Sequence, residues 1–216
     1  MPANLLSGNY QKKCIKGSKF LSSLDQDWNS LVSSVGPCKL NLSIELEPYQ
    51  ALIKSVIFQQ LRPASATAIF NRFKQNFDNN FPTEEKILAS PESKLKESGL
   101  SFNKRKTIIE IARHVQKGEL ENRQNFLIMN DSQIIEKLTK IKGIGEWTAQ
   151  MLMIFNLGKL DVFPAGDFAL RKNYSLFKSI ASPLTMRELS TISEEWKPFR
   201  SIAAWYLWRY RNNILN

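Results

Sequence analysis

The stretch that decides the fold is residues 138–174, which read LTKIKGIGEWTAQMLMIFNLGKLDVFPAGDFALRKNY. A first helix is expected to end near Lys142, and Gly143-Ile144-Gly145 to make a tight turn into a second helix. Glycine permits the positive φ that such a turn needs, and it lets another backbone approach closely. The amides that begin the second helix point outward along the helix dipole, so they form a seat for a phosphate diester. The same spacing also fits an ordinary helix-turn-helix corner, because G-x-G alone is not specific.

Asp167 follows a proline-containing loop and precedes a helical stretch over 168–177. Aspartate often fills the N-cap position of a helix, so one interpretation is structural. A carboxylate on a rigid loop behind a phosphate anchor also suits catalysis, and residue type alone leaves both interpretations open. Asp161, earlier in the same loop, is expected to cap or brace it.

Aromatic residues are plentiful in the second half of the chain. Trp147 and Met151 share one helix face at the spacing i, i+4. Near the C-terminus the aromatic residues are Trp196, Trp205, Tyr206, Trp208 and Tyr210. Aromatic stripes are usually part of a core, so most of these are assigned to packing. Aromatic faces also stack on unpaired bases and attract cations, which leaves a binding role open for some of them.

Most of the remaining sequence has helical patterning. Over 47–61 the apolar residues recur at i, i+3, i+4, i+7 and i+8, and Pro48 suits a first turn. Further helices are expected over 64–77, 103–117 and 198–211. Capping signals precede other helical stretches at Thr83, Ser90, Asn130 and Thr185.

Strand signals are scarce. The period-two alternation over 40–46 has no obvious partner, so it indicates an extended lead-in. The sequence therefore predicts an all-α protein with two packed helical lobes. We expect an N-terminal extension and helical lead-in over 1–45 that packs on the C-terminal lobe, a central lobe over 46–165 with a hairpin at 134–157, and a C-terminal lobe over 166–216.

The composition narrows the choice of partner and site. Among 216 residues, 30 Lys and Arg face 20 Asp and Glu, and a net charge of +10 favours a polyanionic partner such as nucleic acid. The positive cluster at 104–106 is one candidate surface. Two cysteines, Cys14 and Cys38, exclude a four-cysteine iron–sulfur or zinc site within one chain. The single histidine, His114, is interpreted as a surface residue rather than a catalyst.

These pieces together resemble the helix-hairpin-helix base-excision DNA glycosylases, with the DNA-3-methyladenine glycosylase II group nearest. The stretches that carry the resemblance are 57–61, 141–149, 161–171 and 196–209. The combination of the hairpin with a following aspartate is specific, whereas no single fragment is. The resemblance implies a helix-hairpin-helix DNA-binding motif and an active-site cleft between the two lobes.

The resemblance also assigns roles to particular residues. It implies that Asp167 is the catalytic residue, with Asp161 a structural neighbour, and that Gln60 and Leu61 form a wedge that fills the gap left by a flipped base. It implies a phosphate-binding role for the hairpin through Gly143, Ile144 and Gly145. It implies a base pocket lined by Trp147, Met151, Phe168 and Trp208, although some relatives have an aromatic residue where this chain has Met151.

Two departures from the family pattern bear on the subclass. Bifunctional relatives carry a nucleophilic lysine immediately before the Thr-Ala of the second hairpin helix, whereas this chain has Trp147, which cannot form a Schiff base. Some relatives also carry a C-terminal four-cysteine cluster, and this chain has no cysteine after Cys38.

We therefore expect a monofunctional DNA glycosylase that flips alkylated purines out of duplex DNA and hydrolyses the N-glycosidic bond, without a metal or organic cofactor. The expected partner is double-stranded DNA containing alkylated bases, bound by a monomer that has no membrane partner. The expected location is the nucleoid in a bacterial cytoplasm or the nucleus of a eukaryote. Three alternatives stay open: a glycosylase for other damaged bases, a non-catalytic helix-hairpin-helix DNA-binding module, and a basic helical scaffold for RNA or protein.

Overall fold

The computed structural model describes residues 3–210, with side chains from residue 8 onward. Within this range the secondary structure is entirely helical, which confirms the predicted all-α class. The chain forms two compact units. We call residues 43–157 the central unit, and residues up to 42 together with those from 158 onward the terminal unit. None of the helices described is long and apolar enough to cross a membrane.

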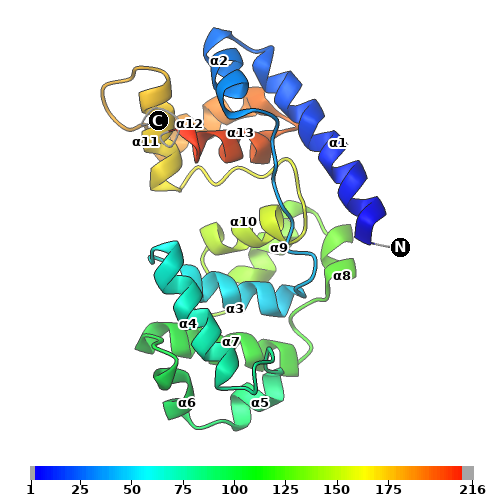
Figure 1. The fold of residues 1–216 in the computed structure, drawn as a ribbon, viewed down its shortest axis with the longest axis vertical. Helices are drawn as coiled ribbons and strands as arrows, with labels where there is room; N and C mark the ends of the chain where they lie inside the picture. Colours follow the sequence, from blue (N-terminus) through cyan, green and yellow to red (C-terminus); the bar gives the residue numbers. More distant parts are fainter. Residues whose placement is uncertain (1–2, 211–216) are drawn as a thin grey trace. The chain divides into compact units, whose positions relative to one another are not determined.

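The central unit contains eight helices within the described range (Figure 1). They are α3 (Pro48–Phe58), α4 (Pro63–Gln75), α5 (Glu84–Ala89), α6 (Glu92–Glu97), α7 (Phe102–Gln116), α8 (Arg123–Ile128), α9 (Asp131–Thr139) and α10 (Glu146–Phe155). Helix α7 packs against α3, α5 and α6, and α10 packs against α3 and α9. The predicted apolar stripe of α3 supplies much of the core, because Leu52, Ile53, Val56 and Ile57 are all buried.

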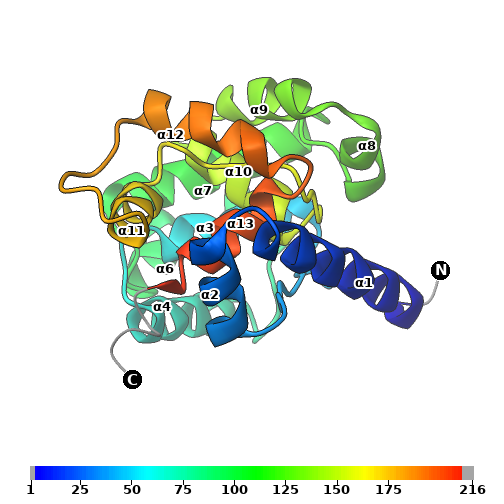
Figure 2. The ribbon, with the colours of Figure 1, turned by 90° about the horizontal axis from the view of Figure 1, so that it is seen from above.

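The terminal unit joins the two ends of the chain. Its described helices are α1 (Ala3–Ser22), α2 (Gln26–Val35), α11 (Phe168–Phe177), α12 (Met186–Ser193), the short 3-10 turn Glu194–Trp196 and α13 (Arg200–Leu207). Helices α1 and α2 both pack against α13, as Figure 2 shows. The indole of Trp196 lies at the centre of this core, with ring centroids 5.4 Å from Trp28, 5.1 Å from Phe163 and 5.4 Å from Tyr174. Most of the C-terminal aromatic residues are thus packing residues, as expected.

The capping signals are confirmed at three of the four predicted positions. The side chain of Thr83 caps α5, and Asn130 and Thr185 each form a capping box. Ser90 is not an N-cap: it ends α5, and Pro91 precedes α6 in extended backbone. The prediction failed because a two-residue connection leaves serine at the end of one helix instead of the start of the next.

Two helix boundaries and one surface assignment also differ from expectation. The helix before the hairpin ends at Thr139 rather than near Lys142. The last helix begins at Arg200, because Phe199 has φ −120° and ψ 29°, and it ends at Leu207; position 211 lies outside the described residues. His114 is half-buried, with its Nδ1 atom 2.8 Å from the Glu110 carbonyl oxygen and its Nε2 atom 3.5 Å from the Glu119 carboxylate. The alternating segment over 40–46 forms no strand.

Candidate active site

The hairpin between α9 and α10 depends on Gly143. Its φ is +94°, a left-handed conformation that other residues adopt only with strain. A Cβ atom at this position would lie 2.0 Å from the hydroxyl oxygen of Thr107 on α7, so even alanine would clash. Gly143 therefore has the expected positive φ, but the group that approaches it closely is the Thr107 side chain and not another backbone.

Gly145 and Ile144 have different roles from Gly143. Gly145 is the N-cap of α10 with φ −92°, and a Cβ there would meet nothing within 4 Å, so this side of the turn is open. Because Gly145 has no side chain, it leaves the first turn of α10 without a side-chain cap. The Ile144 side chain is buried, and its N–H donates to the Ile141 carbonyl oxygen at 3.0 Å. Ile144 thus anchors the turn, and its amide is already engaged.

The turn between α3 and α4 carries the two predicted wedge residues. Gln60 has φ +55°, and Leu61 is exposed over 38% of its surface although its side chain is apolar. The Gln59 side-chain amide donates to the Thr148 hydroxyl at 2.9 Å, which ties this turn to α10. A left-handed glutamine beside an exposed leucine is a strained, solvent-facing turn of the kind that occurs at functional sites.

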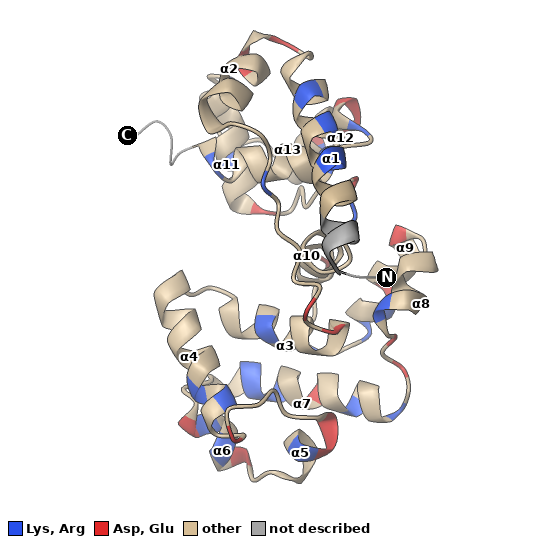
Figure 3. Cartoon of the chain, turned by 45° about the vertical axis from the view of Figure 1, so that its right-hand side comes forward, with Lys and Arg blue, Asp and Glu red and all other residues tan. Residues whose placement is uncertain are grey.

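Lys104 on α7 also binds the turn between α3 and α4. Its Nζ donates to the carbonyl oxygens of Ile57 and Gln59, both at 2.8 Å. A cation at the C-terminal end of α3 also interacts favourably with the helix dipole. Desolvation lowers the pKa of Lys104 below its ordinary value. The basic cluster over 104–106 is therefore only partly a solvated face; Figure 3 shows further basic residues along α4 and α7.

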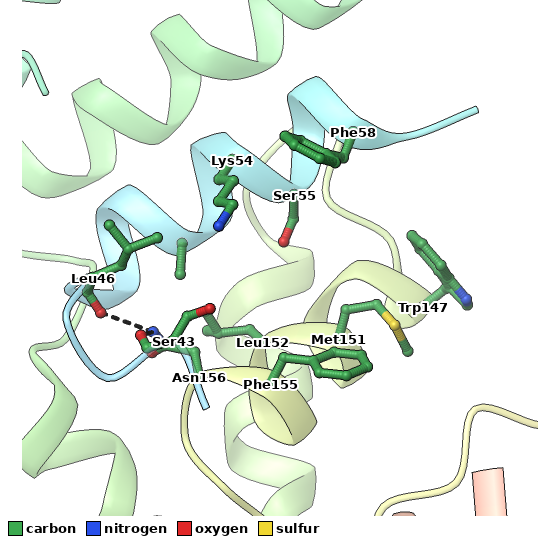
Figure 4. Close-up of a pocket in the computed structure, with 11 residues that line it drawn as sticks. Ser43, Leu46, Lys54, Ser55, Phe58, Trp147, Met151, Leu152, Phe155 and Asn156 are labelled. Carbon is green, nitrogen blue, oxygen red and sulfur yellow. Dashed lines mark hydrogen bonds between the residues drawn. The ribbon is translucent and has the colours of Figure 1, made fainter. Parts of the chain in front are cut away.

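A cavity of about 340 Å³ opens between α3 and α10 within the central unit (Figure 4). Its lining residues are Ser43, Leu46, Ala51, Lys54, Ser55, Phe58, Trp147, Met151, Leu152, Phe155 and Asn156. The volume is in the lower part of the range for small-molecule pockets, and the lining is mostly apolar. Trp147 is 39% exposed and Met151 only 8%, so the indole is at the accessible part of the cavity.

Polar groups organise one side of this cavity. The Asn156 side-chain amide donates to the carbonyl oxygens of Ser43 and Leu46, both at 2.8 Å. The guanidinium of Arg123 donates to the Asn156 and Leu46 carbonyls and to that of Ile44 at 3.2 Å. The Asn156 Oδ1 atom is buried and has no hydrogen-bond partner. The side chains of Arg123 and Asn156 therefore hold several backbone carbonyl groups in place, and the Asn156 Oδ1 atom accepts no hydrogen bond.

Asp167 lies in the terminal unit, where it is the N-cap of α11. One carboxylate oxygen accepts a hydrogen bond from the Leu170 N–H at 3.0 Å, and the side chain is half-buried. The interpretation of Asp167 as a helix N-cap is thus confirmed. It is compatible with a catalytic role, because the capping hydrogen bond fixes the orientation of the carboxylate. Asp161 braces the loop as expected, with its two oxygens 2.8 and 3.1 Å from the Arg200 guanidinium.

The four predicted pocket residues do not all line the cavity. Trp147 and Met151 do, and both come from α10. Phe168 and Trp208 belong to the terminal unit, where Phe168 is 60% exposed and Trp208 is half-buried. Among the described residues, no group of three or more His, Cys, Asp or Glu side chains is arranged to hold a metal ion.

Sequence reasoning missed most of the cavity wall. On α3, the residues Ala51, Lys54, Ser55 and Phe58 follow the spacing i, i+3, i+4, i+7. This second stripe lies beside the apolar stripe that fills the core, and its mixed composition hid it. On α10, Phe155 continues the face of Trp147 and Met151, which a longer helical projection would have included.

A glycine-dependent hairpin between two helices, followed by an N-capping aspartate, defines a helix-hairpin-helix protein. Residues 53–198 match the family described as "HhH-GPD superfamily base excision DNA repair protein", and the chain belongs to this family. The predicted family and fold are confirmed.

The relatives include two proteins of Schizosaccharomyces pombe. "DNA-3-methyladenine glycosylase 1" is 39% identical over 90% of this chain and 86% of its own length. "Alkylbase DNA glycosidase-like protein mag2" is 36% identical over 90% of this chain and 92% of its own length.

Two solved structures are also similar to this chain. The structure of S. pombe 3-methyladenine DNA glycosylase Mag1 in complex with abasic DNA has a TM-score of 0.85 and 39% identity, covering 90% of this chain and 95% of that one. A DNA-3-methyladenine glycosidase from Bacillus halodurans has a TM-score of 0.79 and 29% identity, covering 92% of this chain and 90% of that one.

Proposed function

We propose that this protein is a monofunctional DNA glycosylase that flips an alkylated purine out of duplex DNA and hydrolyses its N-glycosidic bond. The similarity to relatives named as 3-methyladenine glycosylases, over nine-tenths of the chain, supports the reaction class. The observation that carries the proposal is the oriented, half-buried carboxylate of Asp167, the residue to which the resemblance assigns the catalytic role.

In this proposal the hairpin between α9 and α10 binds the DNA backbone. The Gly143 turn is fixed against Thr107, and Gly145 leaves the first turn of α10 open to an anion. A phosphate diester placed there meets backbone amides and the positive end of the helix dipole. This contact reads no sequence, which suits a protein that must inspect every base pair.

Base flipping requires a group to occupy the space left in the duplex. Leu61 is exposed on a turn that Lys104 and Gln59 fix to two neighbouring helices. Unstacking costs a few kcal/mol, and least at a damaged pair. An apolar wedge offsets part of that cost because it restores contact with the neighbouring bases.

The chemical step then needs little acid catalysis. An N-alkylated purine nucleoside carries a positive charge, so the base leaves as a neutral molecule. The departing base takes the bonding electron pair, and the sugar becomes an oxocarbenium-like cation. The Asp167 carboxylate stabilises that cation and accepts a proton from the water that attacks the anomeric carbon. Aromatic faces such as Trp147 attract the cationic base by about 0.5–2 kcal/mol.

The decisive experiment is Asp167→Asn, because asparagine also caps helices well and preserves the α11 N-terminus. We expect single-turnover release of bases from methylated DNA to fall by about 100-fold or more. Affinity for abasic-site DNA and the unfolding midpoint should stay near wild type. Asp25→Asn, which changes the N-cap of α2, is the matched control and should retain excision.

Two results would contradict the proposal. Full excision by Asp167→Asn would remove the catalytic role of this carboxylate. Absence of base release by the wild-type protein, together with tight binding to abasic DNA, would instead favour a non-catalytic DNA-binding module. Because Trp147 replaces the nucleophilic lysine, borohydride should trap no covalent complex with abasic DNA, and a trapped complex would refute the monofunctional assignment.

A further inference from the structure

Helix α1 of the terminal unit carries a row of lysines without acidic neighbours. Lys12, Lys16 and Lys19 recur at the spacing i, i+4, i+7, so they lie on one face of the helix, which we call the lysine face. All three side chains are exposed, and that of Lys13 beside them is exposed as well. Residues 1–24 contain no Asp or Glu. Figure 3 shows the basic residues along α1.

The lysine face points away from the rest of the terminal unit. The opposite side of α1 carries the buried side chains of Cys14 and Ser18, and a Cβ atom on Gly17 would lie 2.2 Å from the Ile202 side chain of α13. Helix α13 packs against α11 as well as α1, and it lies between them in Figures 1 and 2. Because Asp167 is the N-cap of α11, the lysine face is on the far side of α13 from that carboxylate.

Other lysines of the protein are neutralised by nearby carboxylates. The ammonium groups that have a carboxylate oxygen at 2.6–2.9 Å include those of Lys137, Lys140, Lys178 and Lys197. No carboxylate of the described residues forms an ion pair with the lysine face. Like charges three and four residues apart on a helix repel one another and destabilise it. The lysine face is therefore unfavourable for the helix alone, and it becomes favourable when a polyanion lies along it.

The charge density of the polyanion favours DNA over an acidic polypeptide. The lysine face extends over about 10 Å of the helix axis. Duplex DNA carries about one negative charge per 1.7 Å of its own axis. An extended chain of acidic residues carries at most about one charge per 3.3 Å, and it loses conformational entropy when it is ordered on a surface. A rigid duplex therefore offers more negative charge to the three ammonium groups at a lower entropic cost.

We propose that the lysine face of α1 is a second DNA-binding surface, which holds a duplex segment other than the one that carries the lesion. The inference goes beyond the proposed function and rests on it only for the first DNA segment. Once that segment is bound, neighbouring segments of the same molecule are present at a high effective concentration. Contacts between ammonium groups and phosphates form with any base sequence. The protein therefore bridges two duplex segments through opposite sides of α13.

Biolayer interferometry tests the second surface while the first is occupied. An immobilised abasic-site duplex captures the protein, and an undamaged duplex is then added in solution at several salt concentrations. We expect the wild-type complex to capture one further duplex. The triple variant Lys12→Gln, Lys16→Gln and Lys19→Gln keeps good helix formers in α1. It should weaken capture by about tenfold or more and lower the salt dependence, the slope of log K against log salt, by about 2–3. Single-turnover base release should stay within about twofold of wild type.

Two further triple variants serve as controls. Lys86→Gln, Lys96→Gln and Lys117→Gln remove the same charge from exposed positions of the central unit and should leave capture of the second duplex unchanged. Arginine at positions 12, 16 and 19 keeps the charge of the lysine face and should keep the capture.

Three outcomes would overturn the inference. They are no capture of a second duplex by the wild-type complex, equal losses in the two glutamine variants, and displacement of the second duplex by polyglutamate or duplex RNA at lower concentrations than by unlabelled DNA. If the wild-type protein released no base but still captured a second duplex through the lysine face, the glycosylase function would fail and this inference would stand.

Discussion

The Nζ atom of Lys104 lies 2.8 Å from the carbonyl oxygen of Gln59, at the residue that precedes the exposed wedge turn. Three residues further along α7, Thr107 lies against Gly143 of the hairpin. One helix therefore positions both elements that we propose to contact DNA. The two elements are distant in sequence, and their shared support on α7 keeps them in a fixed arrangement within the central unit.

Removal of the Lys104 ammonium should loosen the wedge turn. Lys104→Met leaves two carbonyl oxygens without their donor, and hydrogen bonds to charged groups contribute about 1.5–3 kcal/mol. We expect the rate of base flipping, followed with 2-aminopurine beside the lesion, to fall by about tenfold. Lys117→Met, at the exposed C-terminal end of α7, is the control. A normal flipping rate in Lys104→Met would show that the turn is rigid without this lysine.

The two hairpin glycines should respond differently to alanine. Gly143→Ala places a Cβ against Thr107 in a left-handed conformation, so we expect a loss of about 2–4 kcal/mol in the free energy of unfolding. Gly145→Ala enters open space at φ −92° and should cost about 1 kcal/mol or less. Urea denaturation measures both, and similar losses for the two variants would contradict the assigned geometry.

Arg123→Lys should destabilise the protein although the charge is kept. The guanidinium donates hydrogen bonds to the carbonyl oxygens of Asn156, Leu46 and Ile44 at the same time. A single ammonium group cannot direct donors at all three. We expect a loss of about 2–3 kcal/mol in urea denaturation. Arg113→Lys, at an exposed ion pair with Glu110, should change stability by about 0.5 kcal/mol or less. Equal losses would mean that the positions of these three carbonyl groups do not depend on Arg123.

Acid should weaken the terminal unit through Asp25. Desolvation acts to raise the pKa of Asp25, but hydrogen bonds from Lys178 and from the Trp28 N–H outweigh it, and the pKa lies below its ordinary value. A carboxylate whose pKa is lower in the folded state stabilises the fold above its unfolded-state pKa, and that stabilisation is lost as the pH falls through the folded-state value.

The Asp25 carboxylate is partly exposed, so the effect should be about 0.5–1 kcal/mol. Wild-type protein should lose that much more stability than Asp25→Asn between about pH 6 and pH 3. Urea denaturation at each pH measures the difference, and parallel profiles for the two proteins would refute the role of the ion pair.

The helices were predictable wherever the signal was local. The apolar stripe of α3, the capping boxes at Asn130 and Thr185 and the glycine turn at Gly143 each depend on residues within one or two helical turns. Ser90 was misassigned because capping rules do not distinguish the end of one helix from the start of another when the connection is short. The last helix starts later than predicted because the backbone of Phe199 is not helical.

The site was predictable only where a residue has a recognisable position in a motif. Trp147 could be placed at the cavity because the hairpin fixes its offset, whereas the catalytic role of Asp167 stays a prediction. Lys104 reaches carbonyls 47 and 45 residues away, and Arg123 reaches across 77 residues, so no local pattern reveals these bonds. Lys54 looked like an ordinary polar residue of an amphipathic helix, because a cavity on the second face of α3 arises only from tertiary packing.

Trp147 is the one tryptophan of the central unit, and at 39% exposure it is the most accessible of the five in the chain. In the terminal unit, Trp28, Trp196 and Trp205 are buried and Trp208 is half-buried. Long-wavelength fluorescence that acrylamide quenches easily should therefore come mainly from the cavity mouth, whereas the blue-shifted emission reports on the packed aromatic cluster. The native chain thus carries an optical probe that distinguishes ligand entry from unfolding without any attached dye.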